Sequence, residues 1–435
     1  MGTGSSPVGR TKFKSDFPKE VRLVFYGKIS GKSLTLHDFK AIMSVVLNWE
    51  ADWVMSHVAA VHHHGLDWQR VIAWLRKNTV LAIAMVLAAV SVVLVPPDSA
   101  YADYIDGKTI ACLFGTLAVV CALKNIRFFS ILAKRIILLT GNARTAAVAL
   151  VYITFIGSML IANDMALITF LPLGYLVFSH AGRRQDVATV FILQNIAANL
   201  GGMLTPFGNP QNLYLYAHFE IPTDEFMSIM LIPFLVSIAL ITLCCLLIPK
   251  QRLTMPDEQE ERLPAGRTAI YLTLFAMTIL MVFRVLPVIL VLAVVIIALL
   301  FADRKALLSV DYALLLTFVC FFIFAGNMAR LTPVRSFFSA LLQKNTLLTS
   351  VLSCQVISNV PTAILLSQFT DNYRALLLGV NIGGTGTLIA SLASLITFRE
   401  YTHHYPEDTK GYLVRFGAFN LFFLVVLTVL CLYLC

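Results

Sequence analysis

"IANDMALITFLPLG", residues 161–174, places an asparagine and an aspartate side by side within an almost wholly apolar run. A carboxylate at the centre of a bilayer costs about 2.5–3.5 kcal/mol even on the lower, insertion-based scales. Arg144 precedes the run and an Arg-Arg pair follows it. Because basic loops collect on the cytoplasmic side, both ends are predicted to lie there, with Asn163 and Asp164 at the turn between them.

No polar loop separates the two arms around this turn, which predicts a re-entrant helical hairpin. Irregular backbone is tolerated at membrane depth only where protein or a watery cavity covers it. We therefore expect the turn to stay inside the protein rather than to reach bulk water.

The composition of the whole chain also indicates a membrane protein. Its 435 residues are 58% hydrophobic and 13% charged, with a mean hydropathy of +0.80. Soluble domains carry about 25% charged residues, so the sequence predicts an all-α polytopic protein that crosses the cell membrane several times. The net charge of +9 comes from loops between spans, where the positive-inside rule explains it. The predicted partner is the lipid bilayer, and nucleic acid is not expected.

Cysteine and histidine give little sign of metal or disulfide chemistry. All eight cysteines lie in apolar segments and none forms a CxxC pair, so neither a disulfide framework nor a zinc site is predicted. His62, His63 and His64 form a short run in the polar N-terminal region. A metal site is one interpretation of this run, and we favour the other, a solvated loop.

The chain divides into two halves around a charged linker. Residues 1–77 lack an apolar run of span length and are predicted to be cytoplasmic or interfacial, with a surface helix within 37–60. The first half covers 78–248, the linker 249–267 and the second half 268–435.

Both halves are predicted to contain the same kinds of helix. The nine predicted spans are 78–96, 108–123, 187–216, 227–248, 268–283, 286–302, 310–328, 374–398 and 413–434. The two hairpins are 145–178 and 346–371, and the interfacial stretches are 124–144 and 329–345. Glycines and prolines in "NLGGMLTPFGNPQNLY" and "NIGGTGTLIASLAS" are expected to break the third and eighth spans. The N-terminus is then cytoplasmic and the C-terminus external.

The two broken helices align without a gap. "NLGGMLTPFGNPQNL", from Asn199, and "NIGGTGTLIASLASL", from Asn381, share an Asn, two Gly, a Thr and the closing Leu. Upstream, "IDGKTIACLFGTLAVVCAL" and "VDYALLLTFVCFFIFAG" share their opening Asp. Like order with opposite orientation predicts an inverted repeat whose hairpins open to opposite sides. Asn163 and Asn359, one at each turn, are expected within about 20 Å of each other in a hydrocarbon core of ~30 Å.

The predicted chemistry is ion and anion binding at the broken helices. Such breaks expose N–H groups that attract anions and carbonyls that coordinate small cations. Asparagines at the turns can cap free N–H groups and offer oxygen to a cation. Asp164 supplies a formal charge, which fits Na⁺ or H⁺, and the neighbouring glycines let the backbone approach a ligand closely.

Each of these residues also has a structural explanation. Asn163 can be a helix cap without a ligand, and Asp164 can be a buried acid that pairs with a distant arginine or stays protonated. The Gly-Gly pairs at 201–202 and 383–384 can serve close helix packing. Interhelical hydrogen bonding is the alternative for four polar residues, Thr205, Asn209, Gln211 and Asn212. Their density beside two prolines favours a cavity lining.

These motifs resemble those of the ion-transporter superfamily, which joins divalent-anion/sodium symporters, citrate and arsenite permeases, and one class of sodium/proton antiporters. "NDMALITFLPL" resembles the Asn-Asp hairpin of the arsenite-permease and antiporter branch. "GGMLTPFGNPQN" is similar to a Gly-rich segment of the dicarboxylate symporters. "SNVPTA" matches the second hairpin, and "LIASLAS" resembles the second broken helix of arsenite permeases. The resemblance covers about residues 78–435.

The resemblance implies a scaffold and a moving transport domain that carries both hairpins and both broken helices, often in a homodimer. The implied first half-site is Asn163, Asp164, Gly208 and Asn209, and the second is Ser358, Asn359, Thr362 and Ser391. Further candidates for binding substrate or ion are Thr205, Asn212, Gly384 and Thr385. The Na⁺ candidates are Asn163, Asp164 and Asn359. Two departures, Ala-Asn-Asp in place of the symporters' Ser-Asn-Thr and a missing Thr-Pro, make dicarboxylate transport less firmly implied than the superfamily.

The predicted function is secondary active transport by an elevator-type mechanism. The leading hypothesis is a Na⁺- or H⁺-coupled permease for a small anion, expected to be a carboxylate, with no other cofactor. The alternative is a sodium/proton antiporter or arsenite efflux permease in which Asp164 exchanges the proton. A membrane enzyme or channel is disfavoured, because the spans contain no Ser/His/Asp set, HExxH motif or carboxylate pair. No catalytic residue is therefore predicted.

Overall fold

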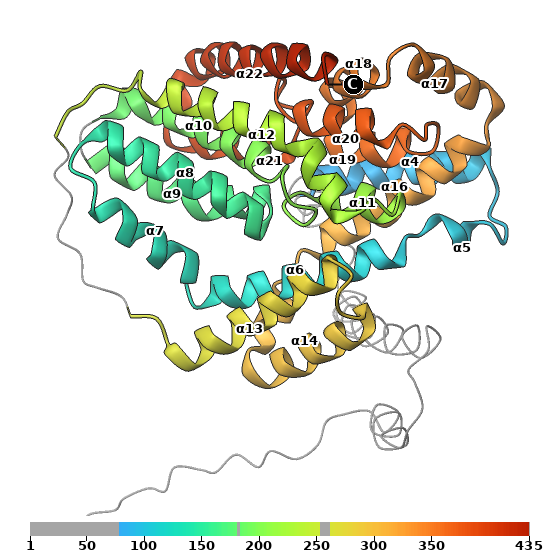
Figure 1. Cartoon of the computed structure of the whole chain (residues 1–435), viewed down its shortest axis with the longest axis horizontal. Helices are drawn as coiled ribbons and strands as arrows, with labels where there is room; N and C mark the ends of the chain where they lie inside the picture. The colour runs from blue at the N-terminus through green and yellow to red at the C-terminus, as the bar shows by residue number, and fades with distance from the viewer. Residues whose placement is uncertain (1–77, 181–182, 253–261, 435) are drawn as a thin grey trace, which may run out of the picture. The chain divides into compact units, whose positions relative to one another are not determined.

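The computed structural model describes residues 78–180, 183–252 and 262–434 (Figure 1). The predictions for residues 1–77, including the three histidines and the surface helix within 37–60, lie outside the described residues, as does the middle of the linker. The described part of the chain is helical and contains no β-strand beyond one isolated bridge between Asn142 and Arg252. The protein is an all-α polytopic membrane protein, as predicted.

The helices follow the predicted order in both halves. The first half contains α4 (Thr79–Leu94), α5 (Tyr101–Tyr104), α6 (Gly107–Asn125), α7 (Phe128–Leu138), α8 (Ala143–Ile161), α9 (Asn163–His180), α10 (Arg184–Gly201), α11 (Pro210–His218) and α12 (Thr223–Cys245). The second half contains α13 (Ala265–Val282), α14 (Val288–Ala302), α15 (Arg304–Leu308), α16 (Tyr312–Arg330), α17 (Thr332–Lys344), α18 (Thr346–Ile357), α19 (Asn359–Leu366), α20 (Tyr373–Ile382), α21 (Leu392–His404), the short helix η1 (Pro406–Asp408) and α22 (Thr409–Leu432).

Six helices of the described chain are long and apolar enough to cross a membrane. Five of them, α6, α12, α13, α16 and α22, coincide with predicted spans, and the sixth, α8, is an arm of the first hairpin. The predicted spans at α4 and α14 are shorter apolar helices of 16 and 15 residues. The two broken spans are each a pair of helices, α10–α11 and α20–α21, with irregular backbone between them. The count of nine spans remains a prediction.

Both hairpins turn at a residue with a positive φ angle. Ala162 ends α8 with a φ of 64°, and Ser358 ends α18 with a φ of 73°. Left-handed backbone at a non-glycine residue costs about 1–3 kcal/mol and persists only where the surroundings enforce it. In each turn the following asparagine accepts a hydrogen bond from the next backbone N–H through its own Oδ1 atom. The same unusual conformation therefore recurs in both halves.

Packing between the first helices of one half and those of the other half also supports the repeat. The carboxylate of Asp106 caps α6 by accepting the N–H groups of Lys108 and Thr109, and Asp311 caps α16 by accepting that of Leu314. α4 packs against α16, whereas α14 packs against α6. Each half thus covers the capped helix of the other half, which is the arrangement expected of a pseudo-two-fold repeat.

The two hairpins lie toward opposite ends of α6. Its C-terminal end leads into α7, which packs on both arms of the first hairpin, α8 and α9. At its N-terminal end, Asp106 lines the same cavity as Gln368, which lies just after α19 at the open end of the second hairpin. In Figure 1 the first hairpin lies on the left, and α17, which leads into the second hairpin, lies on the right. The two hairpins thus lie at opposite ends of α6, and the side of the membrane to which each opens remains a prediction.

The two capping aspartates should contribute to stability rather than to transport. Asp106→Ala and Asp311→Ala each remove the acceptor for first-turn N–H groups, so the free energy of unfolding should fall by about 1 kcal/mol. Asparagine is a comparable cap, so Asp106→Asn and Asp311→Asn should stay near wild type. Thermal unfolding of the purified protein measures this difference. Equal losses in the Ala and Asn variants would show that the charge matters and the cap does not.

Candidate functional site

The turns of the two hairpins meet although they come from opposite halves of the sequence. Asn163 Nδ2 donates to Asn199 Oδ1 at 3.3 Å. A Cβ atom placed on Gly384 would lie 3.5 Å from that oxygen and 3.1 Å from Asn359 Nδ2. These three distances place the two turn amides at most about 10 Å apart, which is well below the ~30 Å thickness of a hydrocarbon core. The predicted proximity of Asn163 and Asn359 is confirmed.

Six asparagines form one hydrogen-bonded network that crosses between the halves. This asparagine network consists of Asn163, Asn195, Asn199, Asn209, Asn212 and Asn381, each at most 4% exposed. Asn209 Nδ2 donates to Asn199 O at 3.2 Å and to Asn381 Oδ1 at 3.4 Å. Asn381 Nδ2 donates to Asn212 Oδ1 at 2.6 Å. The network therefore fixes the two broken helices and the first turn relative to one another.

Asp164 brings a formal charge to this polar centre. Its Oδ1 atom is buried and accepts no hydrogen bond from any residue that the structure describes. None of the ion pairs formed by the described residues includes it. Because a carboxylate oxygen that is buried without a partner is costly, this geometry favours a cation or proton from outside the chain at Asp164.

The first broken helix carries further buried polar atoms without a hydrogen-bond partner. They are Gln194 Oε1, Asn195 Nδ2, Asn209 Oδ1 and Gln211 Oε1. Buried polar groups are nearly always satisfied, so such a cluster marks a place where water or a ligand completes the bonding. No side chain of α20 or α21 joins this set within the described chain. Of the two broken helices in the described chain, the first therefore carries the free bonding capacity.

The backbone carbonyls at the first break already have a partner. Asn212 Nδ2 lies 3.2 Å from Gly202 O, 3.3 Å from Met203 O and 3.5 Å from Thr205 O. We expected such carbonyls to face a cation, whereas here they accept from a side-chain amide. The Asp164 carboxylate is therefore the better candidate for a cation ligand in this half.

Comparison with known proteins places this architecture in a family. The family model described as citrate transporter matches residues 68–373, a range that includes both hairpin turns. The chain belongs to the citrate transporter family. It is thus a multi-pass membrane transporter and not an enzyme.

Relatives in the curated proteins agree with transport. An uncharacterized transporter of Methanocaldococcus jannaschii is 31% identical over 296 residues, covering 68% of this chain and 81% of its own. Inner membrane protein YbiR of Escherichia coli is 29% identical over 306 residues, covering 68% and 80%. The silicon efflux transporter LSI3 of Oryza sativa is 30% identical over 135 residues, covering 31% and 27%.

Several predicted binding residues of this citrate transporter family member use their hydroxyl groups locally. Thr362 Oγ1 donates to Ser358 O at 2.7 Å, and Thr385 Oγ1 donates to Ile382 O at 2.7 Å. Ser391 Oγ caps α21 by accepting the N–H of Ser394 at 3.2 Å. These hydroxyl groups stabilise their own helices, and the structure does not bring them into the asparagine network.

The remaining predicted residues lie at the two breaks and the second turn. Ser358 Oγ donates to Ala390 O at 3.3 Å, which ties the second turn to the second break. Thr205 Oγ1 donates to Met159 O at 3.1 Å, which ties the first break to the first hairpin. Gly208 packs so closely on the Gly202 carbonyl that no side chain would fit there. These contacts are structural and hold the turns in place.

The residues Asn199, Asn381 and Gln355 were not among the predicted binding residues. Asn199 and Asn381 open the aligned repeat motifs, so their shared position was a signal that the repeat itself offered. Gln355 lies in the apolar α18 and has no counterpart of its kind in the first hairpin. Its role is visible only in the structure.

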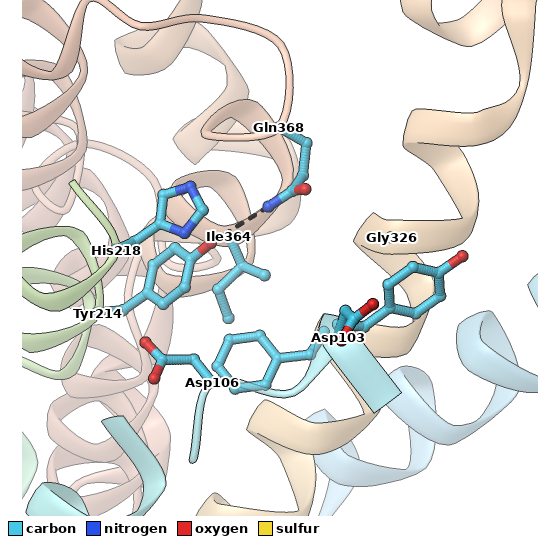
Figure 2. Close-up of a pocket in the computed structure, with 9 residues that line it drawn as sticks. Asp103, Asp106, Tyr214, His218, Gly326, Ile364 and Gln368 are labelled. Carbon is cyan, nitrogen blue, oxygen red and sulfur yellow. Dashed lines mark hydrogen bonds between the residues drawn. The ribbon is translucent and has the colours of Figure 1, made fainter. Parts of the chain in front are cut away.

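A separate cavity of about 130 Å³ lies at the N-terminal end of α6 (Figure 2). It is lined by Asp103, Tyr104, Asp106, Tyr214, His218, Phe322, Gly326, Ile364 and Gln368. The Tyr214 hydroxyl lies 2.8 Å from Ser367 Oγ and accepts from Gln368 Nε2 at 3.3 Å. No member of the asparagine network and no predicted binding residue lines this cavity. Its two carboxylates make it a poor place for an anion.

Proposed function

We propose that this protein is a secondary active transporter of the cell membrane that moves a small anion, expected to be a carboxylate, together with Na⁺ or H⁺. The observation that carries the proposal is the meeting of the two hairpin turns beside a carboxylate oxygen that has no partner in the described chain. Amide groups at the turns suit the anion, and the carboxylate suits the cation.

The turns offer an anion two kinds of favourable interaction. Asn163 and Asn359 each begin a helix, α9 and α19, and the N-terminal end of a helix attracts negative charge. Their side-chain amides add N–H donors, and Gly384, without a side chain, adjoins the Asn359 amide and the Asn199 oxygen to which Asn163 donates. A carboxylate or another small oxyanion fits this set of donors.

The position of Asp164 suggests how anion and cation are coupled. An ionised Asp164 would repel an anion bound at the neighbouring turns, because two like charges would share a site shielded from water. A proton or Na⁺ at Asp164 removes that repulsion and strengthens anion binding. By linkage, the anion strengthens cation binding by the same factor. A loaded transporter then carries both, which is what symport requires.

The packing of the helices supports movement of one group against another. The hairpins α8–α9 and α18–α19 pack on the broken helices α10, α20 and α21. The helices α4, α6, α13, α14 and α16 pack mainly on one another. Motion of the first group past the second would carry the site across the membrane, as in other inverted-repeat transporters.

Transport assays with the purified protein in liposomes test the proposal. Citrate or another small carboxylate should accumulate inside when an inward Na⁺ or pH gradient is imposed, and collapsing the gradient with an ionophore should stop it. Empty liposomes with the same gradient are the control. If no small carboxylate or other oxyanion accumulates under either gradient, the proposed symport is wrong.

A second candidate, export of a small weak acid in exchange for a cation, is favoured by the similarity to a silicon efflux transporter. The same liposomes, preloaded with silicic acid or arsenite, should then lose it when an opposing gradient is applied. Sodium/proton antiport would instead change the internal pH on adding Na⁺ without any anion. These outcomes separate export and antiport from symport.

A further inference from the structure

A side-chain amide holds each break, but the two amides come from different elements: Asn212 of α11 at the first break and Gln355 of the hairpin arm α18 at the second. At both breaks a threonine hydroxyl reaches the hairpin: Thr205 Oγ1 donates to Met159 O, and Thr387 Oγ1 donates to Gln355 O, each at 3.1 Å. Met159 and Gln355 each lie four residues before the asparagine of their turn. They therefore occupy corresponding positions of the repeat, one apolar and one polar.

The side-chain amide of Gln355 forms hydrogen bonds with the backbone of the second break. Its Nε2 atom lies 2.9 Å from Gly383 O, 3.1 Å from Val351 O and 3.2 Å from Thr385 O. Its Oε1 atom accepts the N–H of Thr387 at 2.9 Å. The orientation of the amide is fixed, because only the nitrogen can donate to carbonyls and only the oxygen can accept an N–H group.

A glycine at the break makes room for this side chain. Gly386 has a φ of +116°, a backbone conformation that L side chains rarely adopt. A Cβ atom at this position would collide with Gln355 Oε1. The backbone of the break and the Gln355 amide are thus fitted to each other.

Two carbonyls of the break, Gly383 O and Thr385 O, and one of α18, Val351 O, surround a single point. Grouped carbonyl oxygens coordinate cations at broken helices and in ion filters. Here the point is occupied by an NH₂ group, which has two hydrogens to share among the three carbonyls and carries partial positive charge. The second turn also has Val360 where the first has Asp164, and residues 346–370 contain no acid. The Gly383 and Thr385 carbonyls are therefore engaged by an amide, and the second hairpin has no formal negative charge with which to hold a cation.

We propose that the Gln355 amide takes the place of a cation at the second break, so that the transporter binds a single coupling cation per cycle, at Asp164. The statement about coupling rests on the proposed function. The statement that the Gln355 amide occupies the space among the carbonyls rests on the Gln355 contacts alone. Gln355 is on this view a positioning residue that sets how many cations bind.

Melting temperatures test, without a transport assay, whether the Gln355 amide stands where a cation could bind. Gln355→Glu replaces the donor nitrogen by an oxygen, which faces the three carbonyls and needs a cation. In an Asp164→Asn background the first cation site is removed, so NaCl and choline chloride at equal concentration should give the same melting temperature at pH 8. Adding Gln355→Glu to that background should create a rise of several degrees in NaCl over choline chloride. Gln343→Glu, on an exposed position of α17, is the matched control and should create none.

Two results would overturn the inference. One is a double variant Asp164→Asn/Gln355→Glu that melts at the same temperature in both salts. The other is a Na⁺-dependent rise in Asp164→Asn alone, which would reveal a second cation site in the natural sequence. The wild-type protein gives an independent test that does not depend on whether the variants fold. The Hill slope of cation-dependent uptake should be about 1, and a slope near 2 would refute a single cation.

Discussion

Replacing Asp164 with asparagine should reduce gradient-driven uptake about 100-fold, in a protein that still folds and inserts into the membrane. The substitution keeps the size and shape of the side chain and removes only its charge. Oδ1 accepts no hydrogen bond within the described chain, and the cap on the Asp164 N–H comes from Asn163. No native bond is therefore lost. A coupling free energy of about 3 kcal/mol corresponds to a factor of roughly 100.

The measurement is initial uptake into liposomes with and without the Na⁺ or pH gradient. Asp371→Asn makes the same chemical change at an exposed position just beyond the second hairpin and should leave gradient-driven uptake at the wild-type level. Equal melting temperatures of the two variants would show that the loss is not a folding defect. If Asp164→Asn accumulates substrate with unchanged Na⁺ and pH dependence, Asp164 has no coupling role.

The architecture could be predicted because its signals are local. An Asn-Asp pair inside an apolar run has few explanations other than a buried turn, and Ala162 and Asn163 do form that turn. Clustered glycines and prolines cannot continue a helix, so the break after Gly201 was also predictable. The repeat then assigned the second turn and the second break by correspondence.

The detailed roles of hydroxyl and amide groups could not be predicted, because they depend on tertiary contacts. A threonine near a turn can face a ligand or donate to the carbonyl four residues earlier, and Thr362 does the latter. Ser391 similarly looked like a ligand group and is a helix cap. Gln355 acts on carbonyls that lie about 30 positions away in the chain, a relation that no local pattern encodes.

The glycines at the two breaks had two explanations in the sequence, close packing and ligand approach, and the structure separates them by position. A Cβ atom on Gly201 would collide with the backbone carbonyl of Phe155 and lie 2.6 Å from Ser158 Oγ. A Cβ atom on Gly384 would come no closer than 3.1 Å to any atom, and its neighbours would be the ends of Asn359 and Asn199 and the backbone carbonyl of Asn381. The first contact is helix packing, and the second lies at the meeting of the turns.

Alanine at these two glycines should therefore have different effects. Gly201→Ala forces α8 and α10 apart and should lower the free energy of unfolding by at least about 1–3 kcal/mol, the usual cost of overpacking. Gly384→Ala should cost less stability, since no atom lies within 3.0 Å of the added Cβ and Asn359 Nδ2 at 3.1 Å and Asn381 O at 3.3 Å need shift by only a few tenths of an ångström. It should nevertheless lose most of its uptake, because the methyl group lies against the Asn359 amide and the Asn199 oxygen that Asn163 binds.

Thermal unfolding and uptake measured on the same preparations distinguish these outcomes. Gly417→Ala, on α22 with open space around the added methyl group, is the control and should be neutral or slightly stabilising. A stable Gly384→Ala variant with normal uptake would mean that no ligand enters between the turns. Because Gly384 adjoins both the Asn359 amide and the Asn199 oxygen that Asn163 binds, the anion would then have to bind elsewhere, and the assignment of the site would fail with it.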